Sequence, residues 1–132
     1  VFPLRVYYED TDLSGVVYHP TYLRFMERGR SEFLRVAGLR HQGMLDAVEP
    51  LVWAVRRVAI DYRKPARVDE ALEVHTAVRE LSGARMWLKQ SVRRRDDILT
   101  DAEVEVCVIT LSGQPKRIPG HVADKLAALI TA

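Results

Sequence analysis

The sequence predicts an α+β domain in which one long helix covers a curved antiparallel sheet of about five strands. Residues 20–37 have the periodicity of an amphipathic helix, whereas four later segments alternate apolar and polar residues with a period of two. The short turns between those segments favour antiparallel neighbours. With 132 residues, 48% of them hydrophobic, the chain has the size of one domain, to which we assign residues 1–132.

The long helix is predicted from Pro20 to Ala37. Pro20 suits a first helical turn because its missing N–H would be unpaired there, and Gly38 suits the left-handed position just past the end. Gly29 lies in the middle of the apolar stripe, where a missing side chain predicts close approach to another backbone. The predicted stripe consists of Tyr22, Phe25, Met26, Gly29, Phe33, Val36 and Ala37.

Strands are predicted before and after this helix. The first covers residues 1–9, and the four later ones contain the alternating runs 58–62, 72–78, 86–92 and 102–111. Ser82-Gly83 and Asp96-Asp97 mark turns between strands. Residues 119–130 are predicted to form a short final helix. One helix cannot cover a five-strand sheet and also protect both of its edges, so we expect an oligomer.

Composition excludes several classes of protein. A net charge of +2 does not indicate nucleic-acid binding. Cys107 is the only cysteine, so no intrachain disulfide can form, and a reducing compartment fits best. No segment approaches the ~20 apolar residues of a membrane helix, and the first residues do not resemble a signal peptide. We therefore expect a cytoplasmic protein without a membrane span.

Residues 7–23 are the segment richest in chemically active side chains. Glu9, Asp10, Asp12 and His19 lie there, between the end of a predicted strand and the start of the helix. A helix start presents unpaired N–H groups and partial positive charge, which can stabilise an oxyanion. A nearby carboxylate can attack a carbonyl or activate water. From the residues alone, each acidic side chain can equally be a helix cap or a solvated turn residue, and the histidine can be structural.

Other site chemistries fit the sequence less well. Residues 10–15 match the first half of a calcium loop, but Thr21 stands where the bidentate glutamate belongs. The four histidines never pair at zinc-ligand spacing. The chain has no nucleophile elbow, phosphate loop or dinucleotide fingerprint, and Cys107 falls inside a predicted strand. We expect no metal and no cofactor.

The segment from Tyr7 to Phe25, YYEDTDLSGVVYHPTYLRF, resembles the Tol–Pal-associated acyl-CoA thioesterases, which belong to the 4-hydroxybenzoyl-CoA thioesterase branch of the hotdog superfamily. The similarity continues through residues 27–30 and returns weakly at residues 61–67. It implies the hotdog fold, a long central helix wrapped by the sheet, in dimers or tetramers. It also implies hydrolysis of acyl-CoA, with acyl carrier protein as a further candidate partner.

The resemblance also implies residue roles. Asp12 would be the catalytic carboxylate, acting as general base or nucleophile, and the backbone N–H of His19 would polarise the thioester carbonyl. The imidazole of His19 and the phenol of Tyr8 would lie near the reaction centre. Leu13 and Ser14 fill a variable pair of the motif.

The sequence signals for substrate-binding residues are less specific than those for the catalytic residues. Gly15 fits a turn with positive φ, and Gly15 and Val17 belong to the motif. Tyr22 and Met26 of the helix are candidates for the acyl lining. The coenzyme phosphates need cations, although each candidate is as readily a solvated residue at a strand end. These candidates are Arg56, Arg57, Lys64, Arg67 and the run from Arg93 to Arg95.

Two alternative functions remain from the sequence. Hotdog hydratases use an Asp/His pair on acyl thioesters, and a product assay separates hydration from release of free CoA. A non-catalytic module would bind acyl-CoA or acyl carrier protein and leave the thioester intact. Asp12 argues against the second alternative, because a pure binder gains nothing from a carboxylate beside a carbonyl.

Overall fold

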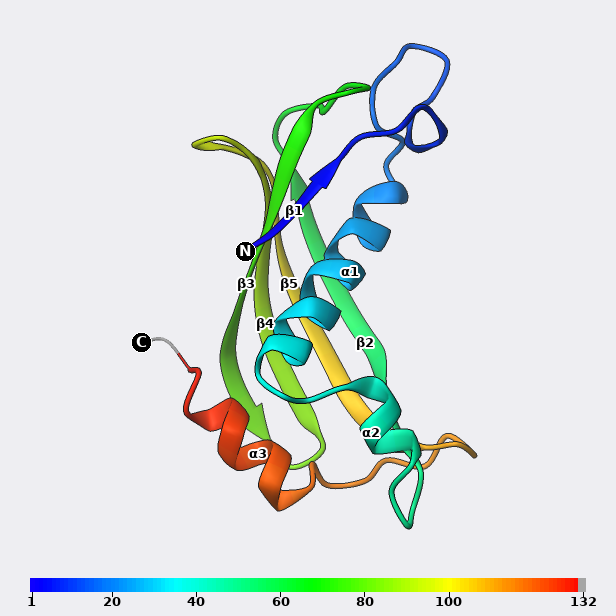
Figure 1. The fold of residues 1–132 in the computed structure, drawn as a ribbon, viewed down its shortest axis with the longest axis vertical. Coiled ribbons are helices and arrows are strands. Elements are labelled where there is room, and N and C mark those ends of the chain that lie inside the picture. Colours follow the sequence, from blue (N-terminus) through cyan, green and yellow to red (C-terminus); the bar gives the residue numbers. More distant parts are fainter. Residues whose placement is uncertain (131–132) are drawn as a thin grey trace.

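The computed structural model describes residues 1–130, in which a long helix lies along one face of a curved five-stranded antiparallel sheet (Figure 1). The sheet order is β1-β3-β4-β5-β2. The elements are β1 (Phe2–Arg5), η1 (Tyr8–Asp10), α1 (Thr21–Val36), α2 (His41–Leu45), β2 (Leu51–Tyr62), β3 (Ala71–Ser82), β4 (Arg85–Arg94), β5 (Asp97–Thr110) and α3 (Gly120–Ala127). The predicted α+β class and hotdog arrangement are confirmed, and the last two residues of the predicted domain lie outside the described residues.

The centre of the sheet is a meander of three strands. Strands β3, β4 and β5 follow one another through tight turns at Gly83 and Arg95, which both have positive φ. The period-two pattern places Leu88 and Val104 opposite each other on the face toward the helix, where both are buried. No helix within residues 1–130 is long and apolar enough to span a bilayer.

The buried face of α1 agrees with the predicted stripe over most of its length. Tyr22, Phe25, Met26 and Gly29 are buried, but the prediction for Val36 is wrong: it is 88% exposed. Leu34, 4% exposed, is buried instead, in the core cluster that contains Leu88 and Val104. Val36 is the last residue of α1, and within residues 1–130 nothing covers its side chain.

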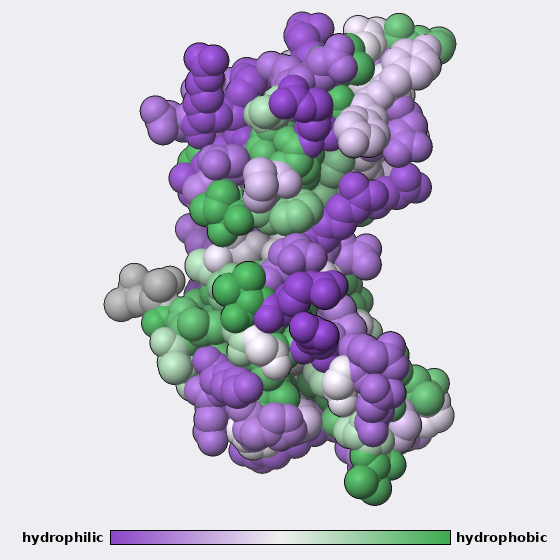
Figure 2. All heavy atoms as spheres, in the orientation of Figure 1, coloured by the Kyte–Doolittle hydropathy of each residue, from purple (hydrophilic) through white to green (hydrophobic). Residues whose placement is uncertain are grey.

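Val36 instead helps to line an apolar hollow of about 230 Å³ beside β1 and β3. Phe2, Phe33 and Leu129 are among the other lining residues. Figure 2 shows apolar atoms gathered at the waist of the molecule. The helix therefore presents part of its predicted core stripe to the surface.

Two predicted strands have different bounds in the structure. The first strand ends at Arg5, because residues 8–10 turn into a short 3₁₀ segment that the Asp10 carboxylate closes by accepting the Tyr7 N–H at 2.8 Å. Strand β2 starts at Leu51, well before the predicted run. A bulge between Val55 and Arg57 breaks the alternation and hides the earlier half of the strand.

The two short helices also differ from what the sequence predicts. Helix α2 was not predicted, since its five residues are too few to show a periodicity. Helix α3 ends at Ala127 rather than at Ile130, which forms a parallel bridge with Val78. Ile130, the last residue that the structure describes, thus lies beside β3.

A buried glutamine attaches the middle of α1 to the sheet. Gln90 of β4 is 1% exposed, and its amide N–H groups donate to the Met26 carbonyl and to the Thr76 hydroxyl, both at 2.9 Å. Its carbonyl oxygen accepts from Arg30 at 3.4 Å, and partial burial lowers the pKa of that guanidinium. These polar groups fix the position of α1 along the sheet, because sliding the helix would leave them unpaired in the core.

Gly29→Ala is expected to destabilise the fold. An added Cβ would lie 2.4 Å from Val74 Cγ1, so overpacking of about 1–3 kcal/mol outweighs the helix-propensity gain of about 1 kcal/mol. Urea unfolding measures the change. Gly43→Ala in α2 is the control, since a Cβ there meets nothing within 4 Å. Combining Gly29→Ala with Val74→Ala should cost less than the sum of the single changes. A Gly29→Ala protein as stable as the wild type would contradict the tight packing.

Candidate active site

A narrow loop immediately before α1 carries the predicted catalytic residues. Residues 10–12 run antiparallel to residues 16–18, and the Asp12 N–H donates to the Val16 carbonyl at 2.9 Å. Gly15 turns the loop with φ +80°, which confirms the predicted positive φ. The loop is therefore a closed turn with its own hydrogen bonds, positioned at the start of the helix.

The chain that follows β2 holds this loop from the other side. The Val17 N–H donates to the Ala66 carbonyl at 2.8 Å, and the Val68 N–H donates to the Gly15 carbonyl at 3.2 Å. The buried hydroxyl of Tyr22 accepts from the Ala66 N–H at 3.1 Å. These bonds join the loop, the first turn of α1 and the β2–β3 connection into one unit.

Asp12 lies exposed in the loop and is bound by its neighbour Ser14. Its Oδ1 accepts the Ser14 hydroxyl at 2.6 Å and the Ser14 N–H at 2.8 Å. These two hydrogen bonds, the hydroxyl's first, hold the pKa of the Asp12 carboxyl below its ordinary value. At neutral pH the group is therefore a carboxylate, the form that a general base or a nucleophile requires.

His19 contributes an unpaired backbone donor at the start of the helix. It precedes Pro20, the N-cap of α1, and its N–H donates to no group within residues 1–130. Its carbonyl accepts the Tyr22 N–H at 3.3 Å. A free N–H in the positive field of a helix start is a donor suited to a carbonyl oxygen that gains negative charge.

Tyr62 and Ser14 take part in this site, although the sequence did not single them out. The Tyr62 hydroxyl donates to the His19 carbonyl at 3.3 Å, and the two rings meet edge to face with centroids 5.1 Å apart. The weak recurrence of the family pattern at residues 61–67 was the available signal for Tyr62. Ser14 gave none, because it occupies a variable pair of the motif.

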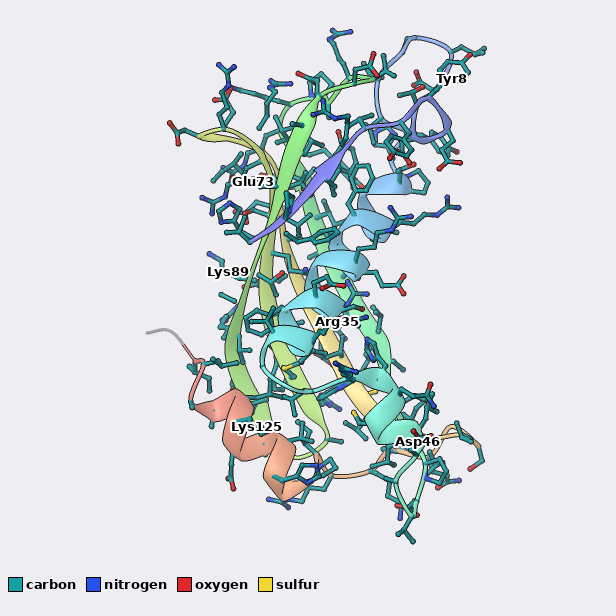
Figure 3. The ribbon with its side chains drawn as sticks, viewed as in Figure 1. Tyr8, Arg35, Asp46, Glu73, Lys89 and Lys125 are labelled. Carbon is teal, nitrogen blue, oxygen red and sulfur yellow. The ribbon has the colours of Figure 1, made fainter. Side chains whose placement is uncertain are left out.

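The phenol of Tyr8 lies apart from these contacts. Tyr8 is 81% exposed and projects outward from the loop (Figure 3). Within residues 1–130 its hydroxyl makes no hydrogen bond to Asp12 or to His19.

The apolar binding candidates belong to the core in a single chain. Val17, Tyr22 and Met26 are all buried beneath the start of α1. Tyr22 packs edge to face against Phe25 and Tyr62. These residues form the buried packing beneath the loop.

The basic candidates are spread over the molecule. Arg67 lies next to the loop, paired with Val16 in an isolated bridge. Lys64 forms an ion pair with Asp97 at 3.2 Å. Arg56 and Arg93 are on sheet strands, where the first binds Glu105 at 2.9 Å and the second donates to Ser91 at 2.8 Å. No group of three or more His, Cys, Asp or Glu side chains in the described part of the chain is arranged to hold a metal ion.

Comparison with known proteins identifies the family. A family model described as "Thioesterase superfamily" matches residues 14–100, more than half of the chain. The chain belongs to the thioesterase superfamily. It is thus a thioester hydrolase, and the matched region runs from the candidate loop to the first residues of β5.

Individual relatives cover almost the whole chain. The acyl-CoA thioesterase YbgC of Haemophilus influenzae is 44% identical over 122 residues, which are 92% of this chain and 89% of the relative. The acyl-CoA thioester hydrolase YbgC of Escherichia coli O6:H1 is 39% identical over 123 residues, 92% of this chain and 90% of the relative. The crystal structure of a probable thioesterase from Bartonella henselae superposes with a TM-score of 0.87 at 42% identity, covering 89% of this chain and 97% of that one.

Ser14→Ala is expected to raise the pKa of Asp12. The change removes the hydroxyl that stabilises the charged carboxylate, so protonation becomes easier and the titration moves to higher pH. Titration of the Asp12 carboxyl carbon by NMR in both proteins measures the shift. Ser112→Ala, which removes a hydroxyl bonded to Thr110, is the control and should leave the Asp12 titration unchanged. Identical Asp12 titrations in Ser14→Ala and wild type would show that Ser14 does not bind the carboxylate in solution.

Proposed function

We propose that the protein hydrolyses acyl-CoA thioesters to a free acid and CoA, with Asp12 as general base or nucleophile. The observation that carries the proposal is that one loop at a helix start contains both an ionised carboxylate, Asp12, and the free N–H of His19. Further support comes from relatives named as acyl-CoA thioesterases at 44% and 39% identity. The finer placement among the Tol–Pal-associated and 4-hydroxybenzoyl-CoA thioesterase-like enzymes is part of the same proposal.

In this proposal the thioester carbonyl oxygen accepts the His19 N–H. Asp12 then either removes a proton from a water that attacks the carbonyl carbon, or attacks that carbon itself and forms an anhydride that water opens at the acyl carbon. In both routes the C–S bond breaks, CoA leaves as the thiolate and takes up a proton, and the acid keeps the oxygen from water. Losing one donor to such an oxyanion typically costs ~3–4 kcal/mol of transition-state stabilisation.

The remaining candidates take supporting roles in the proposal. The Tyr8 phenol and the His19 imidazole border the reaction centre, and Gly15, Val17, Tyr22 and Met26 form the acyl side of the site. Arg67 is the first choice for the coenzyme phosphates because its backbone pairs with the loop. Arg56, Lys64 and Arg93 would contact phosphates only after leaving their present partners. Acyl carrier protein is a second candidate acyl donor, since it carries the same thioester.

Asp12→Asn should abolish most thioester hydrolysis. Replacing the carboxylate by an amide removes both the base and the nucleophile while keeping the shape, so a loss of about 10²–10⁴-fold in kcat is expected. Release of free thiol from short, long and aromatic acyl-CoAs measures the rate and ranks the substrates.

Glu9→Gln is the matched control for this experiment, because it removes the same charge from an exposed residue of the neighbouring turn. It should keep wild-type turnover. Full activity in a folded Asp12→Asn protein would assign the chemistry elsewhere. Absence of thiol release by the wild type would favour the binding module, and hydrated product would favour the hydratase.

In this proposal the protein works as a homodimer or homotetramer. Strand β2 lies at an edge of the sheet with twelve residues, and its outer side pairs with no strand within residues 1–130. A long free edge is normally covered, and a second copy is the partner that the sequence argument names. Light scattering coupled to size-exclusion chromatography should give a mass of two or four chains of 15.1 kDa. A monomeric mass at micromolar concentration would refute this part.

A further inference from the structure

The segment that ends β2 contains a residue for which the proposed reaction gives no role. Residues 61–67 resemble the family pattern weakly, yet the carboxylate and the oxyanion donor both lie in the loop before α1. Tyr62 is the member of this segment whose side chain contacts His19, through both its ring and its hydroxyl.

We propose that Tyr62 is a positioning residue that holds His19 so that its N–H stays available to the thioester carbonyl. The inference rests on the proposed function, because it concerns the donor used in that reaction. Tyr62 reaches His19 across 43 positions of sequence and contacts it at two separate groups, the carbonyl oxygen and the imidazole ring.

The two contacts restrict different torsions of His19. The hydrogen bond at 3.3 Å fixes the carbonyl, and the edge-to-face contact, with an interplanar angle of 81°, fixes the side chain. The residue before a proline already has few backbone conformations, and Pro20 follows His19. With the carbonyl and the side chain of His19 both held, the position of its backbone nitrogen is set before substrate binds.

Tyr62 is itself held by rigid parts of the fold. It is the last residue of β2 and pairs with Thr100 of β5. Its ring also packs against Tyr22, with centroids 5.7 Å apart, and Tyr22 is buried and hydrogen-bonded to Ala66. A functional group supported from a strand end and a buried helix residue keeps its geometry better than one on a loop alone.

The alternative for Tyr62 is a contact with the substrate. Its ring is partly exposed, and a residue that binds the acyl group changes KM as well as kcat. A positioning residue for the oxyanion donor instead changes kcat, because that hydrogen bond strengthens as charge develops on the oxygen. The two roles are therefore separable by kinetics.

Tyr62→Phe, which keeps the ring and removes the hydroxyl, is the central variant. We expect kcat for acyl-CoA hydrolysis to fall by about two- to tenfold, the usual value of one hydrogen bond, with KM nearly unchanged. Tyr62→Leu, which also removes the ring contact, should lower kcat further. Tyr7→Phe removes an exposed phenol hydroxyl near the loop and should leave both constants at wild-type values. Circular dichroism confirms that each variant is folded.

Two spectroscopic measurements separate positioning from a general structural effect. Carbon-13 labelling of the His19 carbonyl reports the hydrogen bond from Tyr62 in the free protein, and its resonance should move in Tyr62→Phe but not in Tyr7→Phe. The infrared carbonyl stretch of an acyl-CoA bound to the slow Asp12→Asn protein reports polarisation by the His19 N–H. Adding Tyr62→Phe should move this band toward its frequency in free acyl-CoA.

The outcomes distinguish the inference from the proposed function. Movement of both signals together with a fall in kcat supports the positioning role. An unchanged His19 carbonyl resonance, an unchanged infrared band, or a rise in KM at constant kcat overturns it while hydrolysis by the wild type still stands. A wild type without thiol release overturns the proposed function, and the positioning role in that reaction fails with it.

Discussion

The close packing of α1 on the sheet is the constraint on which the rest of the molecule depends. Gly29 lets the helix approach Val74 so closely that no side chain fits between them, and Gln90 binds the helix backbone in the same region. Together they fix both the distance and the axial position of the helix. Because the candidate site lies immediately before the first residue of this helix, the same packing sets where the proposed oxyanion donor, His19, stands relative to the end of β2.

The site itself is formed by two segments of chain that meet at that helix start. The loop before α1 supplies the carboxylate and the free N–H, and the β2–β3 connection supplies the backbone groups that hold the loop. Donors that are already oriented stabilise a developing charge without reorganisation during the reaction. The exposure of Asp12 is consistent with this arrangement, because water solvates the carboxylate and the hydrogen bonds from Ser14 stabilise its charged form further.

Periodicity and motif predicted what depends on neighbouring residues, and missed what depends on the curvature of the sheet or on distant contacts. The helix, the β3–β5 meander and the loop with Asp12 and His19 followed from local patterns. The bulge in β2 hid half of a strand, because the period-two rule fails where an extra residue is inserted. Val36 appeared to be a core residue because its spacing is correct, but spacing does not tell whether another element covers that face of the helix. The contact of Tyr62 with His19 joins residues far apart in sequence, so no local pattern contains it.

The two halves of the proposed machinery therefore depend on folding to different degrees. The bonds between Ser14 and Asp12 span two residues, a range over which turns form with little help from the rest of the chain. The bond between Tyr62 and His19 exists only when β2 is paired in the sheet and α1 is packed on it. Loosening of the β2 end would leave the carboxylate in place, but His19, the proposed oxyanion donor, would lose its contact with Tyr62. The chemistry thus depends most on the sheet edge, which lies far in sequence from the motif that identifies the family.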